Sequence, residues 1–466
     1  MNGERTKRWK MAMPLMAVLV LMFIWYGNYI EVAKCTIPYS DFFQWTAKYG
    51  EKVVNRTIEI KDYFESDGGE HIQPLSIYMT LKVLEKTRFD YSALVVFGML
   101  ARCVLAGALS VYCFFNLRGT NKSLFWDYVC SATVAYALLN LNQWEITTEP
   151  FSFGNAIRLA IYFVSFVFSD RWVRGIENRC LRKNIFYALM LGTGISCITL
   201  FIGGGYFVGH ILAIGILFFC EFVKNIKRAK QYFMPMIVWG LATFAGCLIY
   251  MVLIYTGERQ TAIDMSIDIL GILLGWVLYW GAAFFPNGCI SGADGLLLCA
   301  IVGTTALVLM FVLVRNHLCE RKSSTMFPVY CIVYANVIAI VIAAARISKF
   351  SYDTMTSSRY VIESTVGIVG MVWIIGEFIV EADTEWKNRF SYLAGLIVVV
   401  VSLTISAKYE LVRAPYVRQY YDNLEVQLLD YENCPDETLA LISATSPEKA
   451  RMCLDFLKKE HLSIFR

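Results

Sequence analysis

Charged residues are scarce in this chain. Asp, Glu, Lys and Arg make up 17% of its 466 residues, whereas a soluble domain averages about 25%. Hydrophobic residues make up 57%, and the mean hydropathy is +0.51. Apolar runs of roughly 18 or more residues recur, the length that crosses a hydrocarbon core of about 30 Å. Strands that alternate in polarity, as a transmembrane barrel requires, are lacking. The sequence therefore predicts an all-α polytopic membrane protein.

The cysteine and histidine patterns of metal sites are also lacking. Most of the 14 cysteines lie inside apolar segments, where cysteine packs as a small hydrophobe. No CxxC pair or Cys/His cluster has metal-site spacing, so neither a zinc site nor a disulfide framework is predicted. The net charge of +4 is small and gives no indication of nucleic-acid binding.

The first apolar run, residues 11–29, sets the expected orientation. The bases before it are Arg5, Lys7, Arg8 and Lys10. The run is too long for a signal-peptide core and has no small-residue cleavage site. We interpret residues 1–30 as a cytoplasmic N-terminus with a retained signal-anchor helix. Residues 31–92 then form a long first external loop.

The later apolar runs predict a transmembrane bundle over residues 93–407. The expected spans are 93–117, 124–141, 155–168, 185–200, 207–222, 232–255, 296–314, 329–345, 361–380 and 392–407. The run 267–285 is ambiguous. If it spans, Arg315 and Arg321 fall outside, against the rule that short basic loops stay inside. We prefer a re-entrant or interfacial run, which gives eleven spans rather than twelve.

The tail, residues 408–466, has the composition of a soluble appendage. It is charged and shows helical apolar spacing in 438–442 and 452–457. Ser446 followed by Pro447 predicts a helix start, with Ser446 as the cap. We expect a small α or α/β unit, placed outside by the eleven-span version.

Acids in the predicted external segments are candidates for chemistry. Asp41 can accept a proton from a hydroxyl group or hold a divalent cation that bridges phosphate oxygens. The alternative is a loop acid or a helix cap. Glu70 and His71 precede the return to the membrane, and His exchanges protons near neutral pH, although such a pair is commonly a satisfied surface pair. Glu145 and Glu149 are candidate acids of the same cavity.

Arginines at predicted external helix ends are candidates for phosphate binding. Arg346 and the pair Arg359 and Tyr360 bracket a polar segment between two spans. Arginine forks match phosphate oxygens two at a time. The alternative is an arginine that snorkels to a lipid headgroup.

Two further arginines interrupt apolar spans, where ionisable groups are costly and usually face a cavity or a partner. Arg158 lies near the external end of its span and is expected to join the same site. Arg102 lies deeper, and we expect it to pair with Asp127 or with a carbonyl group.

Three short motifs follow one another on the predicted external face. They are Gly69-Glu70-His71-Ile72, then Gln143-Trp144-Glu145-Ile146, then Ala345-Arg346 with Ser358-Arg359-Tyr360. With the signal anchor and the aspartate-bearing loop, this order resembles bacterial multi-spanning glycosyltransferases of the GT-C superfamily. In one bacterial branch the matching motifs are Asn-Glu-His-Arg-like, Gln-Trp-Glu-Asn-like and Gly-Arg…Ser-Arg-Tyr. The departures are Gly69, Ile72, Ile146 and Ala345. Loss of the arginine at position 72 could remove a phosphate or acceptor contact.

The resemblance implies a GT-C-like bundle in the cell (plasma or inner) membrane with an external active site. It implies a polyprenyl-phosphate-linked sugar as donor, a cell-envelope glycan or lipid as acceptor, and often a divalent metal, Mg or Mn. In an inverting transferase of this kind Asp41 would be the general base or a metal ligand. Glu70 and His71 would orient it, and Glu145 would support the acceptor.

The basic residues would take the donor phosphate in such an enzyme. Arg346, Arg359 and Arg158 would neutralise the departing lipid phosphate, and Tyr360 would position it. Two alternatives stay open. A transporter or flippase of lipid-linked saccharides predicts half-helices and internal repeats, for which only 267–285 is a candidate. A polysaccharide polymerase would keep the arginines and depend less on Asp41.

Overall fold

A computed structural model describes residues 2–64, 73–117, 124–255, 268–286, 289, 292–320, 325–347, 351–381, 386–443 and 445–466. In these ranges every regular element is a helix and no strand occurs. Ten helical segments of the described chain are long and apolar enough to cross a membrane. The prediction of an all-α polytopic membrane protein is therefore confirmed.

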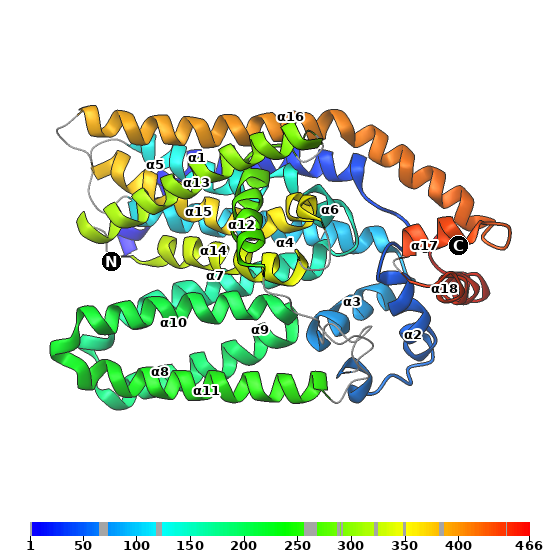
Figure 1. Cartoon of the computed structure of the whole chain (residues 1–466), viewed down its shortest axis with the longest axis horizontal. Coiled ribbons are helices and arrows are strands. Elements are labelled where there is room, and N and C mark those ends of the chain that lie inside the picture. The colour runs from blue at the N-terminus through cyan, green and yellow to red at the C-terminus, as the bar shows by residue number, and fades with distance from the viewer. Residues whose placement is uncertain are drawn as a thin grey trace.

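The long helices lie roughly side by side along the long axis of the molecule (Figure 1). They are α1 (Asn2–Ala33), α4 (Tyr91–Leu117), α5 (Leu124–Leu138), α7 (Ser152–Arg174), α10 (Phe207–Lys224), α11 (Ala229–Tyr255), α13 (Gly292–Glu320), α14 (Phe327–Arg346), α15 (Ser358–Glu381) and α16 (Trp386–Leu429). Helix α15 is central, because 94% of its most apolar window is buried. The corresponding windows of α1, α11, α13 and α16 are 22–28% buried. Exposed apolar surface on this scale indicates contact with lipid.

Short helices connect the long ones. They are η2 (Leu141–Gln143), α6 (Trp144–Thr148), η3 (Ile176–Asn178), η5 (Gly204–Tyr206), η6 (Ile226–Arg228) and η8 (Tyr352–Thr356). The predicted span 185–200 is not one continuous α-helix. It consists of α8 (Leu181–Met190), the π-helical turn η4 (Leu191–Ile195) and α9 (Ser196–Gly203).

Helix α12 (Ile269–Phe284) corresponds to the ambiguous run and has 16 residues. It runs across the direction of the long helices (Figure 1). Near its start, a methyl group added to Gly271 would lie 2.9 Å from the side chain of Ile347, just after α14. At its end, Asn142 of η2 donates a 2.9 Å hydrogen bond to the carbonyl of Phe285. Because α14 ends and α6 begins at the same end of the bundle, the chain enters and leaves α12 there.

In its described residues, the first loop contains two α-helices and a short turn of 3-10 helix. These are α2 (Phe42–Val54), η1 (Ile60–Phe64) and α3 (Pro74–Lys86). Helix α2 buries Phe42, Trp45, Tyr49 and Val53, which the helical period places on one face. The loop thus packs as a structured cap on the bundle.

Every regular element in the described residues of the tail is a helix. The predicted boundary at residue 408 falls inside α16, which continues unbroken to Leu429 and is followed by α17 (Asp436–Ser443), α18 (Pro447–Lys459) and η9 (Ser463–Phe465). The Ser446 hydroxyl accepts a 3.3 Å hydrogen bond from the amide of Lys449, and Pro447 is the first residue of α18. The predicted start of this helix is confirmed.

The tail packs on the first loop. Phe456 of α18 lies so close to α2 that a β-carbon added at Gly50 would overlap its ring. The Phe456 ring also meets that of Phe89, with centroids 5.6 Å apart. Arg466 donates a 2.6 Å hydrogen bond to the carbonyl of Arg88. The loop and the tail therefore form one cap, at the end of the molecule opposite the N-terminus (Figure 1).

Candidate functional site

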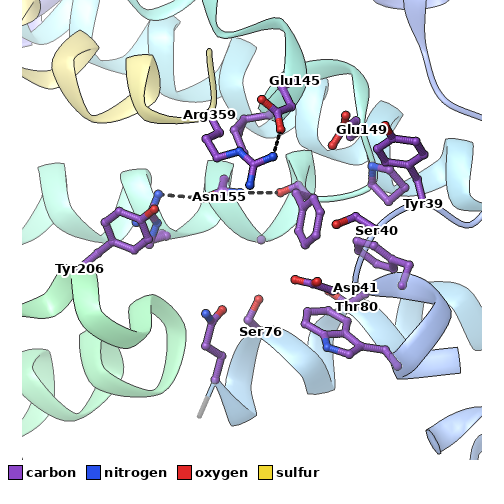
Figure 2. A pocket seen from close by; sticks show the side chains of 18 of the residues that line it. Tyr39, Ser40, Asp41, Ser76, Thr80, Glu145, Glu149, Asn155, Tyr206 and Arg359 are labelled. Carbon is purple, nitrogen blue, oxygen red and sulfur yellow. Dashed lines mark hydrogen bonds and ion pairs between the residues drawn. The ribbon is translucent and has the colours of Figure 1, made fainter. Parts of the chain in front are cut away.

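A pocket of about 420 Å³ lies where this cap meets the bundle. Its walls come from residues 39–45 of the first loop, the start of α3, the α6–α7 region, the turn after α9, the end of α14, the start of α15, and α17. Figure 2 shows the polar side chains that point into it. Segments more than 400 residues apart in sequence thus share one cavity.

Most of the predicted site residues line this pocket. They are Asp41, Glu145, Arg158, Arg346, Arg359 and Tyr360. Glu70 and His71, with the motif that contains them, lie outside the described residues. The structure brings the six residues that line the pocket together, while their chemical roles stay predictions.

Asp41 occupies the N-cap position of α2, but its side chain makes no capping hydrogen bond. The helix-cap alternative therefore does not account for its carboxylate, which reaches the pocket. Ser40, just before it, has a φ of 54°, a left-handed conformation that is uncommon for residues other than glycine. The Ser40 amide donates a 2.7 Å hydrogen bond to the carbonyl of Ile442 in α17. The tail thus holds the backbone that presents Asp41.

Glu145 is held by the start of α15. Its carboxylate forms an ion pair with Arg359 and accepts hydrogen bonds from the hydroxyls of Ser358 at 2.9 Å and Ser357 at 3.4 Å. The side chain of Glu145 is 15% exposed and that of Arg359 is 56% exposed. Glu145 is therefore placed to orient Arg359, which still presents over half of its surface.

Glu149 is a second acid of the pocket and is 3% exposed. Burial raises the pKa of its carboxyl well above the usual value, and the charge of Glu145 adds to this rise, whereas Arg359 opposes it. The protonated form is favoured, and a protonated carboxyl can donate a hydrogen bond. Burial also raises the pKa of the neighbouring Tyr39 phenol.

Arg158 is fixed on several sides. Its guanidinium lies 3.9 Å from the ring centre of Tyr206 and donates a 2.8 Å hydrogen bond to Asn155. It also forms an ion pair with Glu363, which accepts a second hydrogen bond from the hydroxyl of Tyr334. Nη1 of Arg158 has no hydrogen-bond partner among the described residues. The guanidinium is thus rigidly held at the pocket wall, and Nη1 is buried.

Glu363 and Tyr206 were not identified from the sequence. Glu363 is fully buried in α15. An acid inside an apolar span is a signal that could have singled it out. Its partner lies 205 residues away, so sequence spacing gives no indication of the pair.

The charges of the pocket are separated. Figure 2 shows Tyr206 at one side and Asp41 and Ser40 at the other, with the Arg359–Glu145 pair between them. Because Arg158 stacks on Tyr206, its guanidinium belongs to the first side. The pocket therefore has a side with the Arg158 guanidinium, which is paired with Glu363, and a side with a carboxylate.

Arg102 does not line the pocket and is 2% exposed in α4. None of its side-chain nitrogens has a hydrogen-bond partner in the described part of the chain. The expected pairing with Asp127 or a carbonyl is therefore wrong. Asp127 lies in the first turn of α5, whereas Arg102 lies near the middle of α4.

The resemblance also implied a divalent metal, with Asp41 as a possible ligand. Among the described residues, no three His, Cys, Asp or Glu side chains are grouped so that they could hold a metal ion. These residues do not form a metal cage by themselves. Mg²⁺ commonly binds one or two carboxylates together with substrate phosphates. Metal binding at Asp41 stays a prediction, and no step below depends on it.

Comparison with known proteins does not identify a family. No protein-family model, no curated protein and no solved structure matches this chain.

Proposed function

We propose that this protein is a membrane glycosyltransferase that moves a sugar from a polyprenyl-phosphate donor to a cell-envelope glycan or lipid. The observation that carries the proposal is the shared pocket. Residues chosen from the sequence for phosphate binding and for proton transfer, including Arg158, Arg346, Arg359 and Asp41, line the same 420 Å³ cavity.

The separated charges suit this reaction. The donor phosphate would lie beside Arg158, Arg346 and Arg359, which all line the pocket. Asp41 would accept the proton of the attacking acceptor hydroxyl. The new glycosidic bond forms as the bond between the sugar and the phosphate oxygen breaks. The lipid phosphate leaves with that electron pair, and the arginines stabilise its charge.

The contacts refine the roles of the remaining acids. Glu145 would act on the donor indirectly by holding Arg359, rather than by supporting the acceptor. Glu149, kept protonated by burial, would donate a hydrogen bond to a sugar or acceptor oxygen. Tyr360, which is 5% exposed, would form part of the wall beside the phosphate.

The pocket would face the outside of the cell. The α8–α9 stretch runs from the end opposite the pocket to Gly203 at the pocket, and we infer that it is an eleventh crossing, with α12 re-entrant. The end of α7, the connection and the start of α8, at the opposite end, carry Arg174, Arg179, Arg182 and Lys183. Basic loops of this kind stay in the cytoplasm.

The experiment is mass spectrometry of envelope glycans and lipid-linked sugars from cells that lack the protein, with and without the wild-type gene. A transferase predicts that one sugar unit disappears from the glycan and that its lipid-linked donor accumulates. Restoration of the gene reverses both changes. Unchanged glycans and donor pools would contradict the proposal.

Transport of a lipid-linked saccharide is the second candidate. It is favoured by one observation: α12 is short and has both ends at the pocket end of the bundle, as re-entrant transporter segments do. Isolated membranes that lack the protein separate the two candidates when the donor and the acceptor are supplied together on the external face. If the protein is a transporter, these membranes should still form the product, because another protein transfers the sugar. If it is the transferase, they should form none, and membranes that contain it should form the product.

A further inference from the structure

Two buried arginines lie near a single buried glutamate beneath the pocket. Arg158 is 3% exposed, Arg102 is 2% exposed and Glu363 is 0% exposed. Glu363 is already paired with Arg158. Both of these charged groups interact electrostatically with Arg102. The three side chains together therefore carry one uncompensated positive charge.

Two buried hydroxyl groups lie near the part of α4 that carries Arg102. It follows Gly98 by one turn of α4, and a β-carbon at Gly98 would overlap the hydroxyl of Ser152 at the start of α7. Ser152 is fully buried, and its hydroxyl has no hydrogen-bond partner among the described residues. Tyr26 of α1, also fully buried, interacts electrostatically with Arg102. The group that these side chains lack is a hydrogen-bond acceptor that carries a negative charge.

A buried guanidinium of this kind needs a counter-charge. It does not lose its proton in proteins, and an unpaired buried charge costs several kcal/mol. A buried donor without an acceptor adds its own desolvation cost. The three side chains carry one excess positive charge, so the counter-ion should be monovalent. Because they are almost fully buried, it should also be small.

We propose that the interior around Arg102, bounded by Ser152 and Tyr26, binds a small monovalent anion such as chloride. The site is distinct from the pocket, because Arg102 does not line the pocket. It is independent of the proposed transferase activity. The anion would neutralise Arg102 and accept hydrogen bonds from its guanidinium and from the Ser152 hydroxyl.

The test is thermal unfolding of the purified protein in detergent, in sodium chloride and in sodium gluconate at equal ionic strength. A ligand that binds only the folded state raises the unfolding temperature. We expect chloride to raise it by roughly 2 °C or more over gluconate. Arg102→Met should abolish this difference. Arg182→Met, a matched change at an exposed arginine, should keep it.

Two outcomes overturn the site: equal unfolding temperatures of the wild type in chloride and gluconate, or an undiminished chloride effect in Arg102→Met. The first is also the result if water alone satisfies Arg102. If Arg102→Met does not fold, Ser152→Ala and Arg102→Lys serve instead. Each should raise the chloride concentration for half-maximal stabilisation several-fold. An unchanged midpoint in both variants would overturn the site.

Discussion

The amide of Ser40 donates a 2.7 Å hydrogen bond to the carbonyl of Ile442. This contact joins the first loop to the tail at the residue that precedes Asp41. Both Ser40 and Ile442 line the pocket. The tail is therefore part of the site, although about 400 residues separate the two positions.

Ser40 should tolerate glycine but not valine. Its φ of 54° costs an L-residue roughly 1–2 kcal/mol, and a β-branched side chain more. Ser40→Gly should unfold at the same temperature as the wild type or higher, and Ser40→Val lower. Both are measured by thermal unfolding in detergent. A less stable glycine variant would show that the Ser40 hydroxyl, rather than the backbone conformation, matters there.

Gly50→Ala should destabilise the cap. In a helix interior, alanine is normally more favourable than glycine by roughly 0.5–1 kcal/mol. Here the added carbon would overlap the ring of Phe456, which is 6% exposed and also packs on Phe89. Overpacking of this kind costs about 1–3 kcal/mol, which should exceed the gain in helix propensity. Limited proteolysis should then cut the tail more rapidly than in the wild type.

The matched control for this change is Gly240→Ala in α11, where an added β-carbon meets no atom within 4 Å. That variant should be cleaved at the wild-type rate. Equal resistance to cleavage in Gly50→Ala would mean that α18 does not pack on α2 as described.

Glu145 and Arg359 should act as one unit. Glu145→Gln removes the charge that holds Arg359, and Arg359→Met removes the group that is held. Each single change should reduce product formation at limiting donor by roughly tenfold, about 1.4 kcal/mol. The double variant should lose little more than either single variant, because contacting residues are not additive. If the double variant instead loses activity by the product of the two single losses, Glu145 and Arg359 act independently and the prediction is wrong.

Glu149 should make stability depend on pH. Its folded-state pKa is raised well above the usual 4.5, chiefly by burial. A carboxyl group whose pKa is raised by folding stabilises the folded state. This stabilisation is fully present at pH values below the pKa that the group has in the unfolded chain. That stability is lost as pH rises from the unfolded toward the folded value, because the unfolded chain releases the proton first.

Glu149→Gln should therefore flatten the decline of the unfolding temperature above about pH 4.5, while leaving stability at lower pH nearly unchanged. Thermal unfolding across this pH range measures it. The control is Glu59→Gln, an exposed acid in the first loop, which should keep the wild-type profile. Identical profiles for Glu149→Gln and the wild type would contradict a raised pKa.

The membrane architecture was largely predictable, because crossing a bilayer requires long apolar runs. The start of α18 was predictable from Ser446 and Pro447, since capping is a local property. The extension of α16 to Leu429 was not, because the change in composition at residue 408 marks where the helix leaves the apolar layer and not where it ends.

The pairings within the site could not be predicted. The individual residues Arg158 and Glu145 were identified because charges at helix ends are conspicuous. Their partners Glu363 and Arg359 are 205 and 214 residues away, and only packing of α7, α6 and α15 brings them together. The isolation of Arg102 likewise depends on which helix faces it.

The most direct test of the central claim is replacement of Asp41 by asparagine in cells that otherwise lack the protein. Glu59→Gln in the same loop, where Glu59 pairs with Lys61 at 2.7 Å, is the matched control, at equal membrane expression. Mass spectrometry of the envelope glycan and of the lipid-linked donor is the readout. We expect Glu59→Gln to restore the missing sugar, and Asp41→Asn to restore none while the donor accumulates. Full restoration by Asp41→Asn would contradict the assignment of this pocket to sugar transfer.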